Sequence, residues 1–232
     1  MLAVKQEMER ISEQEINGEG LDLRTVNQMI KNAIRESGVA VVSHSEYLSG
    51  LAAGLRTGNV FIKGGAGDFV GSLNSGAKLT IEGDVQNFLA DNMTSGEIIV
   101  SGNAGYCAGP YCYGGNLVIL GHSGNFSATM NKGATLVVNE DVGDDVGTYM
   151  LAGNIVVLGN AGEKLGHFLI SGNIFIRGKW QSLGHNTNID VLTSDDKKFL
   201  QQLFSKYRLD ARPEEFTKIV AQTDRPFYSK KD

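Results

Sequence analysis

The residues of this chain that could do chemistry include a compact group of acids, Glu140, Asp141, Asp144 and Asp145. Carboxylates gathered in this way can bind a cation or act as general acid and base. The alternative is a charged corner of the fold that faces solvent, which needs no substrate. Of the two, we favour the charged corner.

The chain also contains four histidines, His44, His122, His167 and His185. None of them stands in a recognisable motif with a serine or cysteine nucleophile. Each falls near a predicted corner of the repeat described below, so we expect solvated loop residues. The interval between His122 and His185 does not match the recurring unit of that repeat, which places them out of register with each other.

Two cysteines, Cys107 and Cys112, are too few for a disulfide framework. Cys112 is equivalent to Leu169 in the recurring unit, so it occupies an apolar position and is expected to be buried. Cys107 corresponds in the same way to Lys164 and is expected to be exposed. A metal site made of both cysteines and His122 would need a fourth converging ligand, and the sequence does not favour it.

Glycine-rich stretches can cradle phosphate, and Gly65-Ala66-Gly67-Asp68-Phe69-Val70 is the best candidate. It lacks both the Gly-Lys-Ser/Thr ending of a P-loop and the third glycine of a dinucleotide fingerprint. We therefore expect this chain to contain no catalytic, cofactor-binding or metal-binding residues.

The elements that carry these residues form a repeat. Seven segments open with glycine and continue into strand-forming residues, at Gly58, Gly76, Gly96, Gly115, Gly133, Gly153 and Gly172. The intervals are 18, 20, 19, 18, 20 and 19, so the series recurs after every three segments. A period near 19 that contains one strand plus turns predicts a solenoid of β-coils.

Aligned on the second glycine of each segment, two positions are always aliphatic. They are Val60, Leu79, Ile98, Leu117, Leu136, Ile155 and Ile174, and then Ile62, Ile81, Val100, Ile119, Val138, Val157 and Ile176. Residues two apart on a strand point to the same side, so these columns form the core of one parallel sheet. The outward residues between them are nearly as apolar: Phe61, Thr80, Ile99, Val118, Val137, Val156 and Phe175. We expect either a terminal helix or a partner to cover them.

Asparagine follows the opening glycine in four coils, at Asn59, Asn116, Asn154 and Asn173. These amides could stack between coils, or asparagine could simply tolerate the turn conformation there. The sequence leaves both alternatives open.

The pattern divides the chain into three parts. They are an N-terminal segment with a capping helix (1–37), the β-helix repeats (38–190) and C-terminal helices with a tail (191–232). Asp22 is the expected N-cap of the first helix, and Gly38 ends that helix and opens an eighth, diverged coil.

Two further helices are expected after the repeats. Thr193 and Asp196 form a capping box at the start of the first. Pro213 is expected to start the second, a short helix that carries three apolar residues, Phe216, Ile219 and Val220.

Composition limits the partners of the chain. The 232 residues have a net charge of -5 and a pI of about 5.4, and no basic stripe is present to neutralise phosphates. No apolar run approaches the roughly 20 residues that span a bilayer, and no signal-peptide pattern occurs. We expect a cytoplasmic protein that binds neither nucleic acid nor membrane.

The glycine motifs resemble a known family. They are Gly65-Ala66-Gly67-Asp68-Phe69-Val70-Gly71, Gly102-Asn103-Ala104-Gly105 with Gly109, Gly121-His122-Ser123-Gly124, and Gly159-Asn160-Ala161-Gly162 with Gly166. Together they are similar to the C-terminal (GXGXG) domain of glutamate synthase, over roughly Ile16 to Val220. The sequence departs from the commonest pattern at Ala128, Glu140 and Gln181, where we expect locally looser corners.

The resemblance implies an all-β fold, a right-handed parallel β-helix of about seven to eight coils with N- and C-terminal capping helices. It also implies a stand-alone, non-catalytic subunit of a glutamate-synthase-type complex. The partners implied are a glutamine amidotransferase subunit and an FMN-containing synthase subunit, and this chain would brace them and help to enclose an ammonia route. FMN and an iron–sulfur cluster belong to those partners. This chain begins with Met1-Leu2-Ala3 rather than a nucleophilic cysteine, and it has no cysteine set for a cluster.

Three alternatives remain open at this stage. One subunit of formylmethanofuran dehydrogenase shares the repeat, so the chain could be a scaffold in such a complex. It could instead be a free-standing β-helix enzyme on carbohydrate or acyl substrates, with Asp144 or Asp145 as the residues to test. The chain could also form a homo-oligomer.

Overall fold

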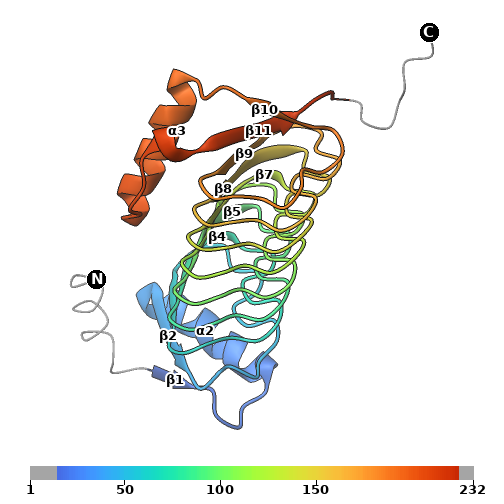
Figure 1. The fold of residues 1–232 in the computed structure, drawn as a ribbon. Helices are drawn as coiled ribbons and strands as arrows, with labels where there is room; N and C mark the ends of the chain where they lie inside the picture. Colours follow the sequence, from blue (N-terminus) through green and yellow to red (C-terminus); the bar gives the residue numbers. More distant parts are fainter. Residues whose placement is uncertain (1–14, 225–232) are drawn as a thin grey trace.

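The computed structural model describes residues 15–224 and shows a parallel β-solenoid (Figure 1). One strand per coil joins a single sheet. The parallel strands are β1 (Glu15–Asn17), β2 (Val39–Ser43), β3 (Asn59–Ile62), β4 (Ser75–Ile81), β5 (Ser95–Val100), β6 (Asn116–Ile119), β7 (Lys132–Val138), β8 (Ala152–Val157) and β9 (Asn173–Ile176). The predicted solenoid is confirmed, and the coil expected after Gly38 is β2, which pairs with β3.

The aliphatic columns form the core that the sequence predicts. Ile62 pairs in register with Ile81, and Ile81 with Val100, and all three side chains are fully buried. Full burial of such a side chain contributes about 1.5–3 kcal/mol to stability. The repeat therefore stacks equivalent aliphatic side chains on one another, and each coil buries the core residues of the next.

The opening glycines follow from close approach between coils. At Gly153 the backbone has φ +91°, and a Cβ there would meet the carbonyl oxygen of Ala134. A side chain at this position would therefore be strained and would also collide with the preceding coil.

The corners that depart from the glycine pattern keep the backbone conformation and the coil-to-coil hydrogen bonds of their neighbours. Ala128 takes φ 56°, in the same left-handed region as the glycines at equivalent corners. The Glu140 N–H still donates to the Gly121 carbonyl (3.3 Å), and the Gln181 N–H donates to the Ala161 carbonyl (3.2 Å). Coil-to-coil hydrogen bonds hold these corners, and a side chain is tolerated where it does not meet the neighbouring coil.

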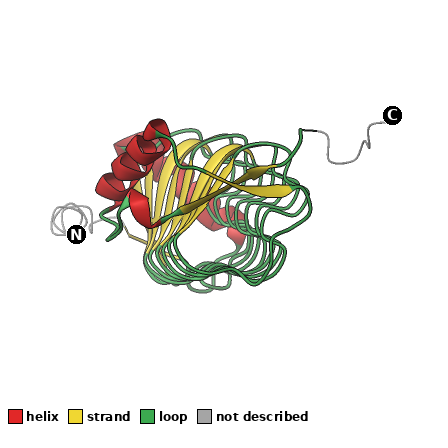
Figure 2. Cartoon of the chain, turned by 45° about the horizontal axis from the view of Figure 1, so that its top comes forward, coloured by secondary structure: helices red, strands yellow, loops and turns green. Residues whose placement is uncertain are grey.

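Helix α2 (Leu23–Ser37) covers the N-terminal end of the solenoid. Its N-cap is Asp22, whose Oδ1 accepts the Thr25 N–H at 2.8 Å, and Gly38 ends the helix at φ 81°. Val26 and Ile30 are fully buried in the core of the first coils. Figure 2 shows α2 lying across the far opening of the solenoid.

The C-terminal segment returns to the sheet. Strand β10 (Thr187–Asp190) leads to α3 (Ser194–Tyr207), a short 3₁₀ helix η2 (Pro213–Glu215) and β11 (Thr217–Ala221). Pro213 does start a short helix, but the prediction that this helix carries Phe216, Ile219 and Val220 is wrong, because the helix ends at Glu215 and Phe216 is its extended C-cap. Ile219 and Val220 lie on β11, which pairs antiparallel with β9 on one side and β10 on the other. Two sheet partners decide the conformation of this short apolar run, and the local sequence does not specify them.

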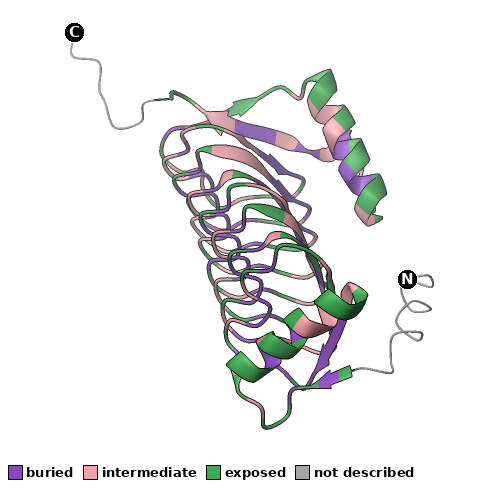
Figure 3. Cartoon of the chain, turned by 180° about the vertical axis from the view of Figure 1, so that it is seen from behind, coloured by how far each residue is buried: buried purple, intermediate pink, exposed green. Residues whose placement is uncertain are grey.

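Helix α3 lies along the outer face of the sheet (Figures 2 and 3). Thr193 and Asp196 form the expected capping box. The buried apolar residues of α3 join one cluster with outward residues of the later coils: Leu200, Leu203 and Phe204 with Val118, Val137, Val156, Leu158 and Phe175. A terminal helix therefore covers the later coils, whereas Phe61 and Thr80 of the earlier coils stay half-buried. Among residues 15–224, no helix is both long and apolar enough to cross a membrane.

Candidate functional site

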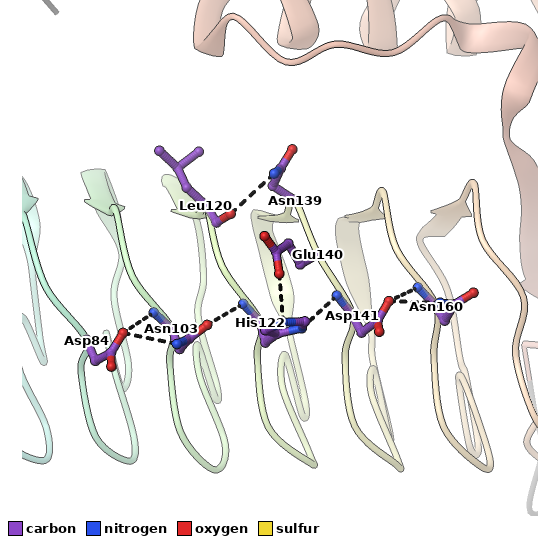
Figure 4. Close-up of polar contacts among 8 residues, drawn as sticks. All are labelled: Asp84, Asn103, Leu120, His122, Asn139, Glu140, Asp141 and Asn160. Carbon is purple, nitrogen blue, oxygen red and sulfur yellow. Dashed lines mark hydrogen bonds and ion pairs between the residues drawn. The ribbon is translucent and has the colours of Figure 1, made fainter.

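Two of the four acids with catalytic potential, Asp141 and Asp144, lie in ladders that connect the coils. In the first ladder, Asp84, Asn103, His122, Asp141 and Asn160 stand at one corner of successive coils (Figure 4). The Asn103 N–H donates to Oδ1 of Asp84 at 2.7 Å, and the Asn160 N–H donates to Oδ1 of Asp141 at 2.6 Å. Each side chain thus accepts the backbone N–H of the next coil.

Asp144 belongs to a second ladder. Its own N–H donates to Oδ1 of Asn125 (2.9 Å), and its Oδ1 accepts the Glu163 N–H (2.7 Å). Asp141 and Asp144 therefore bond to neighbouring coils, and the structure favours the charged-corner alternative for both. The sequence carries a signal for the first ladder, because its members all directly follow the second glycine position of a coil.

His122 fills a ladder position with a ring in place of an amide. Its Nδ1 accepts the Asp141 N–H (3.2 Å), so the proton of the neutral ring sits on Nε2, 2.6 Å from Glu140. His167 repeats the arrangement, since its Nδ1 accepts the His185 N–H at 3.1 Å. His167 and His185 therefore stand one coil apart. The recurring unit of the sequence spans three coils, so it does not reveal this relation.

The predicted asparagine stack forms at one place. The amide of Asn173 donates to Oδ1 of Asn154 at 3.1 Å. Asn59 and Asn116 of two earlier coils pair in register with Lys78 and Thr135 of the next coil. Neither therefore has an asparagine beside it in that coil with which to form the same hydrogen bond. At Asn154 and Asn173 the stacking alternative holds.

Both cysteines are buried. The expectation for Cys112 is confirmed, whereas Cys107 is only 8% exposed and the prediction of exposure is wrong. Phe88 and Phe126 occupy the equivalent left-handed positions of the coils on either side.

Burial also makes the two thiols unreactive. It raises the pKa of Cys107 to about 11 and that of Cys112 to about 12, so neither forms a ready thiolate. Within the described part of the chain, no three His, Cys, Asp or Glu side chains gather as a metal site would require.

The glycines at 65 and 67 are explained by packing between coils. A Cβ at Gly65 would lie 2.6 Å from the carbonyl oxygen of Asp84, and one at Gly67 would lie 2.7 Å from that of Leu48. Only a residue without a side chain fits there. The solenoid itself requires these glycines, so they give no support to a phosphate cradle.

A polar cluster fixes the C-terminal end of α3 to the sheet. Glu97 on β5 accepts hydrogen bonds from Tyr207 (2.6 Å) and Lys206 (2.6 Å), and Lys78 lies 3.3 Å away. Burial alone would raise the pKa of Glu97, but these bonds and charges outweigh it and hold the pKa below its usual value. Burial, followed by the bond to Glu97, raises the pKa of Tyr207 to about 12.

The loop side of the solenoid contains a feature that the sequence does not reveal. Each coil places several residues in the left-handed region, and many of them are not glycine. One left-handed column faces the core and holds only Gly or Ala. A Cβ at Gly71, for example, would meet Cδ1 of Ile98 at 2.6 Å. Two residues further on, a second left-handed position holds Gly54 in the first coil and a set of residues with side chains in the coils that follow: Leu73, Asn92, Tyr111, Met130, Tyr149 and Phe168.

We call this second set the loop-side column. Its φ values lie between 51° and 58°, a conformation that costs a residue with a side chain roughly 1–2 kcal/mol. Its large side chains are nevertheless partly in solvent, with Leu73 60% exposed, Tyr111 39% and Tyr149 36%. This backbone conformation favours glycine. The backbone conformation therefore does not explain why large side chains occur at these positions.

Lys132 and Tyr113 lie beside this column at Tyr111. The Lys132 Nζ lies 4.3 Å from the Tyr113 ring centre and 5.7 Å from that of Tyr111, and it donates to the Tyr113 hydroxyl at 2.9 Å. Tyr113 is 54% exposed. Exposed apolar side chains that gather on one side of a molecule are typical of interaction surfaces, and we take the loop-side column with Tyr113 as the candidate functional site.

Comparison with known families agrees with this architecture. The model of the GXGXG motif family matches residues 111–223. This region is similar to the GXGXG motif family, that of the glutamate synthase C-terminal domain, and the match spans just under half of the chain. No curated protein matches the sequence. The coils before residue 111 pair in the same register as those inside the GXGXG match, so the repeat continues N-terminal to it.

Proposed function

We propose that this chain is a non-catalytic structural subunit of a glutamate-synthase-type complex. The match to the GXGXG motif family supports the relation to glutamate synthase. The observation that carries the structural role is the loop-side column, where large apolar side chains stay partly exposed in a backbone conformation that favours glycine. Asp141 and Asp144, by contrast, bond to the next coil.

In this proposal the loop-side column binds a partner subunit. A glutamine amidotransferase subunit and an FMN-containing synthase subunit are the partners, and the solenoid holds them at a fixed separation while they carry out the chemistry. The rigidity comes from coil-to-coil bonding on both sides of the solenoid. The same brace would help to enclose a route for ammonia between the two centres.

Reconstitution tests the proposal. The two candidate partner subunits from the same source are assayed for glutamine-dependent glutamate formation with and without this chain. We expect activity to rise on its addition and to stay low with the Leu73→Asn/Tyr111→Asn variant. Asn92 already occupies this column, so asparagine keeps the backbone conformation. Activity that is independent of the chain, or equal with wild type and variant, would overturn the role assigned to the column.

A further inference from the structure

The last strand of the sheet has an open edge. Strand β10 pairs antiparallel with β11, and within residues 15–224 it has no strand on its other side. The Gln222 N–H donates to the Asn186 carbonyl at 2.9 Å, which fixes the alternation of hydrogen bonds along the pair. The backbone groups of Asn188 and Asp190 therefore face β11, and those of Thr187 and Ile189 face the open edge.

The side chains on this strand are unusually exposed for apolar residues. Ile189 pairs with Ile219, which pairs with Ile174, so it continues the inward row two strands beyond the last coil. Ile174 and Ile219 are fully buried, whereas Ile189 is 51% exposed. Val191, two residues further on, is 81% exposed.

The other edge of the sheet is different. Strand β1 is three residues long, and its Glu15 is paired with Lys63 at 2.5 Å. Short length and charge are common ways to blunt an edge strand. Strand β10 is four residues long and also carries one charged residue, Asp190, but its apolar residue, Ile189, is half exposed, whereas Ile16 of β1 is buried.

We propose that the β10 edge binds the β10 edge of a second copy of this chain, as an antiparallel pair about a two-fold axis. With the axis at Ile189, Ile189 faces its own copy and Thr187 faces Val191 of the other chain, all on one face. On the opposite face Asn188 meets Asp190, so a carboxylate meets an amide and not another carboxylate. An antiparallel pair of identical strands has two-fold symmetry, and this register is self-complementary.

The pairing satisfies the backbone groups that face the open edge. The N–H and C=O of Ile189 bond to those of Ile189 in the other copy, and the Thr187 N–H bonds to the Val191 carbonyl. It also removes the exposed Ile189 side chain from water. The inference does not depend on the proposed function, because a free or a complexed chain could pair in this way.

Sedimentation equilibrium of the full chain tests the proposal. We expect a dimer at micromolar concentration and a folded monomer for Ile189→Lys, with circular dichroism confirming the fold. Leu73→Lys is the matched control, since it places a lysine at a similarly exposed apolar site on the loop side, and it should remain dimeric. A monomeric wild type, or a dimeric Ile189→Lys, would overturn the proposal.

Cross-linking tests the register. Ile189→Cys should be joined rapidly by a short thiol-specific cross-linker, whereas Thr187→Cys alone should not, because it faces Val191. Mixing Thr187→Cys with Val191→Cys should restore the cross-link. The wild type is the blank, since Cys107 and Cys112 are buried. Equal cross-linking at 187 and 189 would contradict the two-fold axis at Ile189.

Discussion

On the sheet side of the solenoid the outward residues Val118, Val137 and Val156 lie fully buried beneath α3. On the loop side the outward residues Leu73 and Tyr111 are partly in solvent, although their backbone conformation favours glycine. Within residues 15–224, α3 covers the later part of the sheet-side row, whereas Leu73 and Tyr111 of the loop side stay partly in solvent. This difference separates residues that stabilise the fold from residues available to a partner.

The largest effect on stability is expected from a substitution beneath α3. Phe204 is 2% exposed and its ring lies 5.2 Å from that of Phe216. Phe204→Ala should lower the free energy of unfolding by about 3–5 kcal/mol, because it removes buried surface and leaves a cavity. Urea unfolding measures the loss. A loss below about 1 kcal/mol would mean that α3 does not pack as described.

The next effect concerns the cluster that fixes the end of α3. Glu97→Gln should cost about 1–2 kcal/mol at neutral pH, after allowance for partial exposure. Because folding lowers the pKa of Glu97 from its usual 4.5, its contribution is present above that pH and is lost as pH falls through the folded pKa. The difference between wild type and variant should therefore shrink in acid. A difference that stays constant down to strongly acidic pH would contradict the assignment.

At high pH the same cluster loses stability as pH rises, the opposite of its behaviour in acid. Folding raises the pKa of Tyr207 from 10.0 to about 12, so its contribution is complete below pH 10 and is lost as pH rises through about 12. Tyr207→Phe should unfold with a smaller pH dependence than wild type in that window. Spectrophotometric titration of the tyrosines provides the independent check, and a variant with the pH dependence of wild type would contradict the assignment.

A smaller effect is expected at the ladders of the corner. Asp141→Ala leaves the Asn160 N–H without its acceptor, and since the site is exposed we expect a loss of about 1 kcal/mol. Asp141→Asn is the matched control, because asparagine fills the same column at Asn103 and Asn160, and it should keep most of the stability. Thermal or urea unfolding measures both variants. Equal losses would show that the charge matters more than the hydrogen bond.

The smallest effect on stability is expected on the loop side. Leu73→Asn should change the free energy of unfolding by less than about 0.5 kcal/mol, because the side chain is mostly exposed and asparagine tolerates the left-handed conformation. The same substitution should weaken binding of the partner subunits about tenfold, as the loss of an interface anchor does. A large stability loss with unchanged binding would reverse the roles assigned to the two sides.

Much of the fold could be predicted because the repeat places like residues in register. The columns around Ile62 and Val60 identify the core, and Asp22, Gly38 and Thr193 mark the helix ends through their own local chemistry. The cover of the sheet could be predicted only as a choice between a helix and a partner, because spacing alone does not show where a helix folds back.

The candidate site could not be predicted for a different reason. A leucine or tyrosine at positive φ has no local sequence signal, and only the hydrogen bonds between coils impose that conformation on Leu73 and Tyr111. Ile219 shows the same limit, since it becomes part of a strand through pairing with β9 and β10. Cys107 is buried although the equivalent Lys164 is exposed, because a lysine reaches solvent from a position where a thiol does not.

Hydrogen exchange of the reconstituted complex tests the central claim most directly. Amide exchange is compared by mass spectrometry in the free chain and in the chain bound to the candidate partner subunits. We predict slower exchange around residues 72–74, 91–93 and 110–113 on the loop side, and unchanged exchange in α3. Protection confined to α3 and the sheet side, or no protection on the loop side in a complex that does form, would contradict the account.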